Sequence, residues 1–186
     1  EITHTVNPYS GSSSEGINQV FLQADIVKLF RSYRSTWEIA RFTQRIVPNP
    51  DLIAMERHGP PPAINHFSND TEETEGIKRL IVAFRNSGHH SMAIITKTHQ
   101  HSKHLYNALR STGVHLLTAD STSFKSGVII TTAHLAKGLE FDEVLVPFVS
   151  ARNYHTEVDR RMLYIACTRA MHQLTLTYST QLTPLI

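Results

Sequence analysis

Residues 128–147 read VIITTAHLAKGLEFDEVLVP, two short apolar and β-branched runs separated by a polar turn. Runs of this length that are bounded by turn residues predict buried strands. Elsewhere in the chain, similar runs alternate with segments of helical periodicity. That alternation is typical of βαβ units, so the sequence predicts an α/β fold with a mostly parallel sheet and helices on both faces.

The same pattern predicts seven strands, at residues 26–29, 63–66, 92–96, 114–117, 128–131, 143–147 and 174–178. The clearest helix is expected at residues 72–86. Apolar side chains recur there at i, i+3, i+4 and i+7, the first turn is acidic, and a glycine follows the last turn. This segment is therefore predicted to pack one face on the sheet.

Two further helices carry candidate functional residues. Ser35 and Glu38 have the spacing of a capping box, which predicts a helix with Ser35 as its N-cap. Tyr33 and Arg34 would then lie in the preceding turn, beyond the carboxyl ends of the strands, where open α/β sheets bind ligands. The other helix is expected at residues 159–171.

The chain has 186 residues, enough for one ordinary domain with a sizeable core. Residues 1–24 contain a Ser/Gly-rich run and are expected to form a flexible lead-in, whereas residues 25–186 are expected to form the domain. The 18 Lys and Arg residues nearly balance the 16 Asp and Glu residues, so charge alone does not predict a nucleic-acid partner.

The single cysteine, Cys167, excludes an internal disulfide and a multi-cysteine metal site, and we expect it to be a buried small residue. No apolar run approaches the roughly 20 residues of a membrane span, and no secretion signal is visible, so we expect a cytoplasmic protein. His99, His101 and His104 lack cysteine or carboxylate partners at ligand spacing. A solvated helix face is therefore favoured over a zinc site, and no metal ligands are assigned.

The polar turn after residue 131 offers several groups that could bind a ligand. Thr132 and Lys137 could hold nucleic-acid phosphates, and Gly138 would permit a close backbone approach. Glu140 could accept hydrogen bonds from a ribose hydroxyl. Because all of them follow one strand, we expect them at one strand end. The alternative is a polar turn between two buried strands, which uses similar residues.

Arg169 is expected at the edge of the apolar stripe of its helix, from which its guanidinium could reach out. An arginine suits a phosphoryl group because it stays charged and offers a planar fork of donors. The alternative is a solvated basic face favoured by the helix dipole. Similarly, Tyr33 and Arg34 could be a stacking ring and a phosphate ligand, or packing and surface charge.

Four motifs resemble the second RecA-like domain of UvrD/Rep-type superfamily 1 helicases, in the same order and with the same spacing. They are RSYRST at residues 31–36, MAIIT at 92–96, TAHLAKGLEFD at 132–142 and LYIACTRA at 163–170. The resemblance spans roughly residues 26–178. It implies a RecA-like fold, but the chain nowhere contains the phosphate loop G-x-x-x-x-G-K-[ST]. We therefore expect one domain of a larger ATPase.

The resemblance implies a role for each matching residue. Tyr33 would stack on adenine, Arg34 and Arg169 would approach the γ-phosphate, and Gly138 and Glu140 would border the ribose. The residues expected toward the nucleic-acid strand are Thr132, His134 and Lys137. ATP would bind between this domain and an N-terminal RecA-like domain of the same chain, which would supply the phosphate loop and the Mg²⁺ ligands.

Two departures from the family pattern affect the predicted function. His4 stands where the tail of the third motif usually has glutamine, and the large accessory domain that UvrD-type helicases insert between Arg34 and Thr132 is absent. ATP-driven movement along single-stranded or partly duplex DNA is the leading prediction. The alternatives are a HelD-like ATPase domain that remodels RNA polymerase, and a docking domain that keeps the fold without catalysis.

Overall fold

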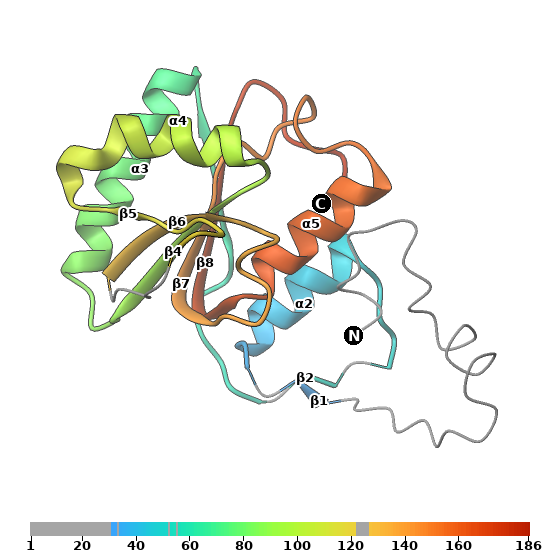
Figure 1. Ribbon diagram of the computed structural model, residues 1–186. Coiled ribbons are helices and arrows are strands. Elements are labelled where there is room, and N and C mark those ends of the chain that lie inside the picture. The colour runs from blue at the N-terminus through green and yellow to red at the C-terminus, as the bar shows by residue number, and fades with distance from the viewer. Residues whose placement is uncertain (1–30, 33, 52, 55, 122–126) are drawn as a thin grey trace.

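In the computed structural model, the described residues are 31–32, 34–51, 53–54, 56–121 and 127–186. They form a six-stranded sheet in the order β3-β8-β7-β4-β6-β5, in which every neighbouring pair is parallel (Figure 1). Its strands are β3 (Ala63–Phe67), β4 (Ser91–Thr96), β5 (His115–Leu116), β6 (Gly127–Thr132), β7 (Phe141–Val146) and β8 (Ala170–Ser179). The predicted parallel α/β fold is confirmed.

The helices cover both faces of this sheet. They are α2 (Trp37–Ile46), α3 (Asp70–Arg85), α4 (His99–Leu109) and α5 (Glu157–Cys167), with a 3-10 turn at Arg110–Thr112. A separate two-residue parallel pair joins β1 (Arg31–Ser32) to β2 (Ile53–Ala54). Figure 1 shows α3 and α4 on one side of the sheet and α2 and α5 on the other.

Strand alternation divides the apolar side chains into two cores. In β4, Ala93 and Ile95 face the core beneath α2 and α5, whereas Met92 and Ile94 face the core beneath α3 and α4. Since successive side chains of a strand point to opposite faces, a strand buried on both faces must be apolar throughout. This is why the middle of β4 and of β6 reads as a continuous apolar run.

Helix α3 agrees with the sequence prediction, apart from a two-residue shift of its start. Asn69 caps it by accepting a hydrogen bond from the amide of Glu72 at 2.9 Å. Ile77, Ile81 and Phe84 lie in the second core, as their spacing predicts. Acidic residues in the first turn complement the helix dipole.

The capping box predicted at Ser35 and Glu38 is wrong. The N-cap of α2 is Thr36, whose side chain makes no capping hydrogen bond. Ser35 instead donates from its hydroxyl to the carbonyl oxygen of Ala170 at 2.7 Å, and Glu38 accepts from the amide of Gly59 at 2.9 Å. Tertiary contacts therefore use the two side chains that the local pattern assigned to each other.

The C-terminal helix also differs from its predicted range of 159–171. A capping box of Thr156 and Asp159 starts α5 at Glu157, and the helix ends at Cys167 because the chain enters β8 at Ala170. Cys167 is fully buried, as expected, and burial raises the pKa of its thiol. Among the described residues, no helix is long and apolar enough to cross a membrane.

Several predictions concern residues outside the described ones. These are the lead-in at residues 1–24, the strand at residues 26–29, and the roles of His4 and Tyr33.

Candidate functional site

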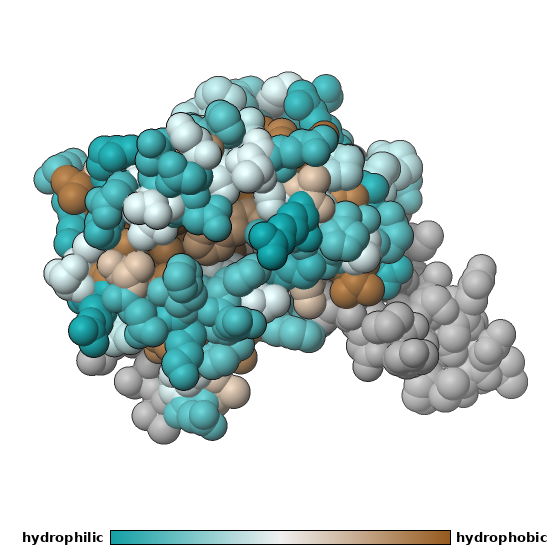
Figure 2. All heavy atoms as spheres, turned by 90° about the horizontal axis from the view of Figure 1, so that it is seen from above, coloured by the Kyte–Doolittle hydropathy of each residue, from teal (hydrophilic) through white to brown (hydrophobic). Residues whose placement is uncertain are grey.

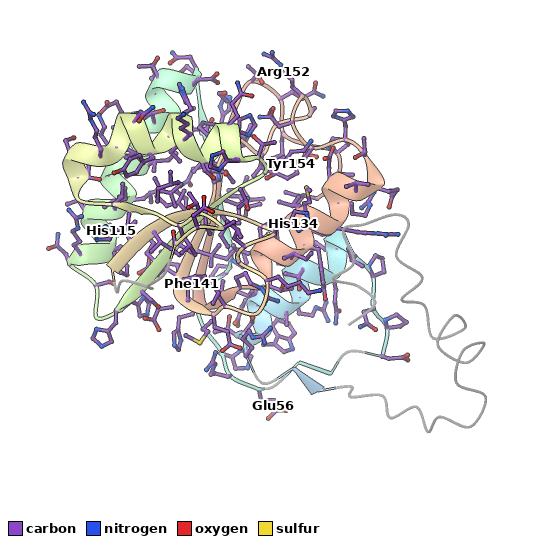
Figure 3. The ribbon with its side chains drawn as sticks, viewed as in Figure 1. Glu56, His115, His134, Phe141, Arg152 and Tyr154 are labelled. Carbon is purple, nitrogen blue, oxygen red and sulfur yellow. The ribbon has the colours of Figure 1, made fainter. Side chains whose placement is uncertain are left out.

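The two ends of the parallel strands define two edges of the sheet. At the amino ends, Phe141 of β7 pairs with Ala170 of β8, and we call this the amino edge. At the carboxyl ends, Thr96 of β4 pairs with Thr132 of β6, and we call this the carboxyl edge. In Figure 3, Phe141 lies low, whereas Tyr154, in the loop that follows β7, lies high.

The polar turn at residues 133–140 therefore connects the two edges. Thr132 ends β6 at the carboxyl edge, and Glu140 immediately precedes β7 at the amino edge. The expectation that all the polar groups of this motif emerge at one strand end is wrong. Strands β6 and β7 run in the same direction on either side of β4, so the connection between them must return along the sheet. The motif supplies groups to both edges.

Small apolar residues anchor this turn. Ala133 and Ala136 are buried in the first core, while His134 and Lys137, each the next residue in the chain after one of them, are exposed. The amide of Ala136 donates to the carbonyl of Thr132 at 2.9 Å, which closes the first turn of the connection. Gly138 follows with φ of +88°, a conformation that favours glycine. The exposed groups are thus carried on a turn fixed by burial.

Arg34 lies at the amino edge, not at the carboxyl edge where the sequence placed it. Its Nε donates to Oε1 of Glu140, and both side chains are partly exposed. Its neighbours in the chain are fixed to the start of β8, since the amide of Thr36 donates to the carbonyl of Met171 at 3.2 Å. Two residues that the sequence assigned to one nucleotide site are therefore in direct contact.

Arg169 lies beside this pair but is buried, with 1% of its surface exposed. Its guanidinium donates to the carbonyl of Ile165 at 3.2 Å, to that of Leu139 at 3.4 Å and to the hydroxyl of Thr168 at 3.2 Å. The carbonyls at the C-terminal end of α5 favour a cation there. The alternative of a solvated basic face is therefore wrong for Arg169, and the side chain does not reach outward as predicted.

Leu139 lies between Gly138 and Glu140 in the chain, so its hydrogen bond with Arg169 brings Arg169 close to both residues. The amino edge thus brings together Arg34, Arg169, Gly138 and Glu140. Two guanidinium groups suit phosphate oxygens, a carboxylate suits ribose hydroxyls, and a glycine leaves backbone groups accessible. We call these four residues, which the sequence assigned to a nucleotide site, the half-site.

The carboxyl edge holds charged residues that sequence reasoning missed. Nζ of Lys97 lies 2.5 Å from Oδ1 of Asp159. Glu73 is fully buried, next to Phe148 in the loop after β7. Oε1 of Glu73 accepts from the hydroxyl of Thr177 at 2.6 Å and from the amide of Phe148 at 2.8 Å. The sequence signal for Glu73 was its position one turn before the apolar stripe of α3. Figure 2, which looks onto this end from above, shows a mostly hydrophilic surface with apolar side chains in a hollow.

Burial and these contacts shift the pKa values of both carboxyl groups. Burial raises the pKa of Glu73, although its hydrogen bonds oppose the shift. Burial also acts on Asp159, but hydrogen bonds from Lys97 and from the amides of His155 and Thr156 outweigh it and lower its pKa to about 2. Asp159 is therefore a stable carboxylate at neutral pH.

The nucleic-acid candidates do not form a single cluster in the structure. Thr132 is half-buried at the carboxyl edge, and the exposed His134 and Lys137 lie along the turn toward the amino edge. Among the histidines, His99 and His104 on α4 are exposed, and His101 is half-buried against Phe148. Within the described part of the chain, no group of three His, Cys, Asp or Glu residues could hold a metal ion.

Comparisons with known proteins identify the family of this domain. The UvrD-like helicase C-terminal domain family matches residues 127–177, which include the polar turn and Arg169. The crystal structure of the C-terminal domain of a possible DNA helicase from Lactobacillus plantarum WCFS1 is 34% identical, with a TM-score of 0.71. The similarity covers 83% of this chain and 91% of the Lactobacillus plantarum chain. The chain belongs to the UvrD-like helicase C-terminal domain family.

A second relative is the RecBCD enzyme subunit RecB of Chlamydia pneumoniae, which is 48% identical over 54 residues. The match spans 28% of this chain and only 5% of the RecB subunit. Together with the fold, these similarities establish a helicase-family domain.

Proposed function

We propose that this chain is the C-terminal motor domain of an ATP-dependent DNA helicase or translocase and that it completes an ATP site formed with another domain. The observation that supports it best is the half-site at the amino edge, which gathers two arginines in a chain without a phosphate loop. An N-terminal RecA-like domain of the same protein would supply that loop and the Mg²⁺ ligands. The isolated chain is expected to be inactive.

Each residue of the half-site has a proposed task. Arg34 and Arg169 would contact the γ-phosphate, Glu140 and Gly138 would border the ribose, and Tyr33 would stack on adenine. ATP supplies the free energy through hydrolysis of its terminal phosphoanhydride bond. Positively charged donors that meet the phosphate only when two domains close would couple that reaction to movement.

In this structure the two arginines are held by protein groups. Glu140 holds the Nε of Arg34, and main-chain carbonyls hold the guanidinium of Arg169. Phosphate oxygens bind arginine through the same N–H groups. We infer that nucleotide binding would exchange these contacts, with Glu140 becoming free to accept from a ribose hydroxyl.

We propose that single-stranded DNA runs along the turn at residues 133–140 and past the carboxyl edge. Thr132, His134 and Lys137 would contact its backbone, with Lys137 as the exposed cation of the three. One segment would then carry DNA contacts at one end and nucleotide contacts at the other. Such a segment would link the two sites through a turn that Ala133 and Ala136 anchor in the core. We also propose a cytoplasmic location.

The test is steady-state ATP turnover of the full-length protein with and without single-stranded DNA. The Arg169→Ala variant should lose turnover by about 10³-fold or more, the range that arginine fingers contribute. Because Arg169 is buried, Arg34→Ala is the second variant, since its side chain is partly exposed and its loss threatens the fold less. Arg79→Ala, an exposed arginine on α3, is the matched control and should retain full turnover.

Undiminished turnover in a folded Arg34→Ala variant would contradict the proposed site. ATP turnover that single-stranded DNA leaves unchanged, together with co-purification of RNA polymerase, would replace the DNA motor by a polymerase-remodelling ATPase. The names of the two relatives refer to a DNA helicase and a RecBCD subunit, which favours DNA.

A further inference from the structure

Arg57, between β2 and β3, joins the two chain segments that carry the half-site arginines. Its Nη2 donates to the carbonyl oxygen of Arg34 and, at 2.9 Å, to the carbonyl oxygen of Met171. Met171 is the second residue of β8 and lies two positions after Arg169. The guanidinium group of Arg57 therefore bonds to the backbone of Arg34 and to the start of β8, which follows Arg169.

The backbone of Arg57 strengthens the same junction. Its carbonyl oxygen accepts from the amide of Trp37, the first residue of α2, at 2.8 Å. The carbonyl of Met171 also accepts from the amide of Thr36 at 3.2 Å. Arg57, the start of α2 and the start of β8 thus form one hydrogen-bonded unit directly behind Arg34.

The neighbouring residues hold Arg57 at this junction. A Cβ at Gly59 would lie 2.7 Å from Cγ2 of Thr36, so only glycine allows this close approach. The amide of Gly59 donates to Oε2 of Glu38 at 2.9 Å, and His58 Nδ1 lies 2.8 Å from the other oxygen of that carboxyl. Hydrogen bonds from His58 and Gly59 lower the pKa of Glu38, which keeps it an acceptor at neutral pH.

The contacts of Arg57 indicate a positioning task. Its Nη2 bonds to two main-chain carbonyls, whereas its buried Nε has no hydrogen-bond partner among the described residues. Donors that bridge two carbonyls fix the relative position of two backbone segments. Since misplacement of a catalytic group by about 1 Å can cost on the order of 10²-fold in rate, such a bridge matters for a site built from distant segments.

We propose that Arg57 is a positioning residue that sets Arg34 and Arg169 at the correct separation for one phosphate group. The inference rests on the proposed function, and it adds a residue that makes no contact with the nucleotide. Loss of Arg57 should lower kcat for ATP turnover by about 10²-fold and leave KM for ATP nearly unchanged. Because a loss of stability that only reduces the folded fraction would also lower the apparent kcat at unchanged KM, kcat is expressed per folded molecule.

The first measurement does not depend on catalysis. In this chain labelled with ¹⁵N, the Nε–Hε resonance of Arg34 reports its bond to Glu140 and is assigned by its disappearance in Arg34→Lys. Arg57→Ala should shift or broaden that resonance, whereas Arg79→Ala should leave it unchanged. An unchanged Arg34 resonance in Arg57→Ala would overturn the inference, whatever the ATP turnover shows.

The second measurement uses the full-length protein and compares Arg57→Ala, Arg57→Lys and Arg34→Ala. Arg57→Lys keeps a charged donor, so its kcat should be at least about tenfold higher than that of Arg57→Ala. If the alanine variant fails to fold, the lysine variant tests the proposal in its place. If Arg34→Ala loses turnover but Arg57→Ala does not, the positioning role is wrong and the proposed function stands. If Arg34→Ala retains full turnover, the proposed function itself fails.

Discussion

The two edges of the sheet use charged side chains in opposite ways. At the carboxyl edge, Glu73 and Asp159 are buried and their oxygens accept from neighbouring loops and strands. At the amino edge, Arg34 and Glu140 remain partly exposed and bond to each other. Arg169 beside them is buried and donates to main-chain carbonyls.

This difference separates stability from function within one sheet. Buried carboxylates with several donors stabilise loops, because removing them leaves buried donors unpaired. Exposed ion pairs contribute little to stability, because water screens the charges and the side chains lose entropy when they pair. Arg34 and Glu140 can therefore exchange partners at little cost, as the proposed nucleotide site would require. Substitutions at the two edges should have correspondingly different effects.

The largest stability effect is expected for Glu73→Ala. It removes the acceptor of the Thr177 hydroxyl and of the Phe148 amide, and Phe148 is held at a φ of 60° that is unfavourable for a non-glycine residue. The free energy of unfolding should fall by about 3 kcal/mol at pH 7, measured by urea denaturation. Glu75→Ala, an exposed residue of the same helix, should change it by less than about 0.5 kcal/mol. Similar values for both variants would show that Glu73 does not hold the loop.

Asp159→Asn tests the second buried carboxylate through its pH dependence. The folded-state pKa of about 2 is lower than the ordinary value of 3.8, so its stabilisation is complete above about pH 4 and is lost as pH falls through 2. The variant should be less stable than the wild type by roughly 2 kcal/mol at pH 7, and the difference should shrink toward pH 2. Denaturation at a series of pH values measures it, with the exposed Asp120→Asn as control. A difference independent of pH would contradict the assigned ionisation.

The smallest effect is expected at the amino edge. Glu140→Gln breaks an ion pair whose side chains are 32% and 43% exposed, so the free energy of unfolding should change by less than about 0.5 kcal/mol. Thermal unfolding at low and high salt measures it, and the small difference should disappear at high salt. A loss above about 1.5 kcal/mol would mean that Glu140 stabilises the fold in the way that Glu73 does, and the contrast between the edges would fail.

Local patterns predicted the elements of this fold well. Apolar runs identified β4, β6 and the second half of β8, and helical periodicity identified α3, because these signals depend on residues close in sequence. The capping box at Ser35 failed because Ala170 and Gly59 compete for the same two side chains. The end of α5 was missed because strand pairing of Ala170 with Phe141 stops the helix.

The sequence by itself determined the α/β class, through the alternation of apolar runs with helical segments, and the family of the domain, through its short motifs. Only the tertiary structure decided that Arg34 meets Glu140, 106 positions away, at the amino edge. It also decided that Arg169 is buried and that Arg57 joins the two arginine segments. Strand order and direction fix these contacts, and they result from packing the whole sheet between two layers of helices.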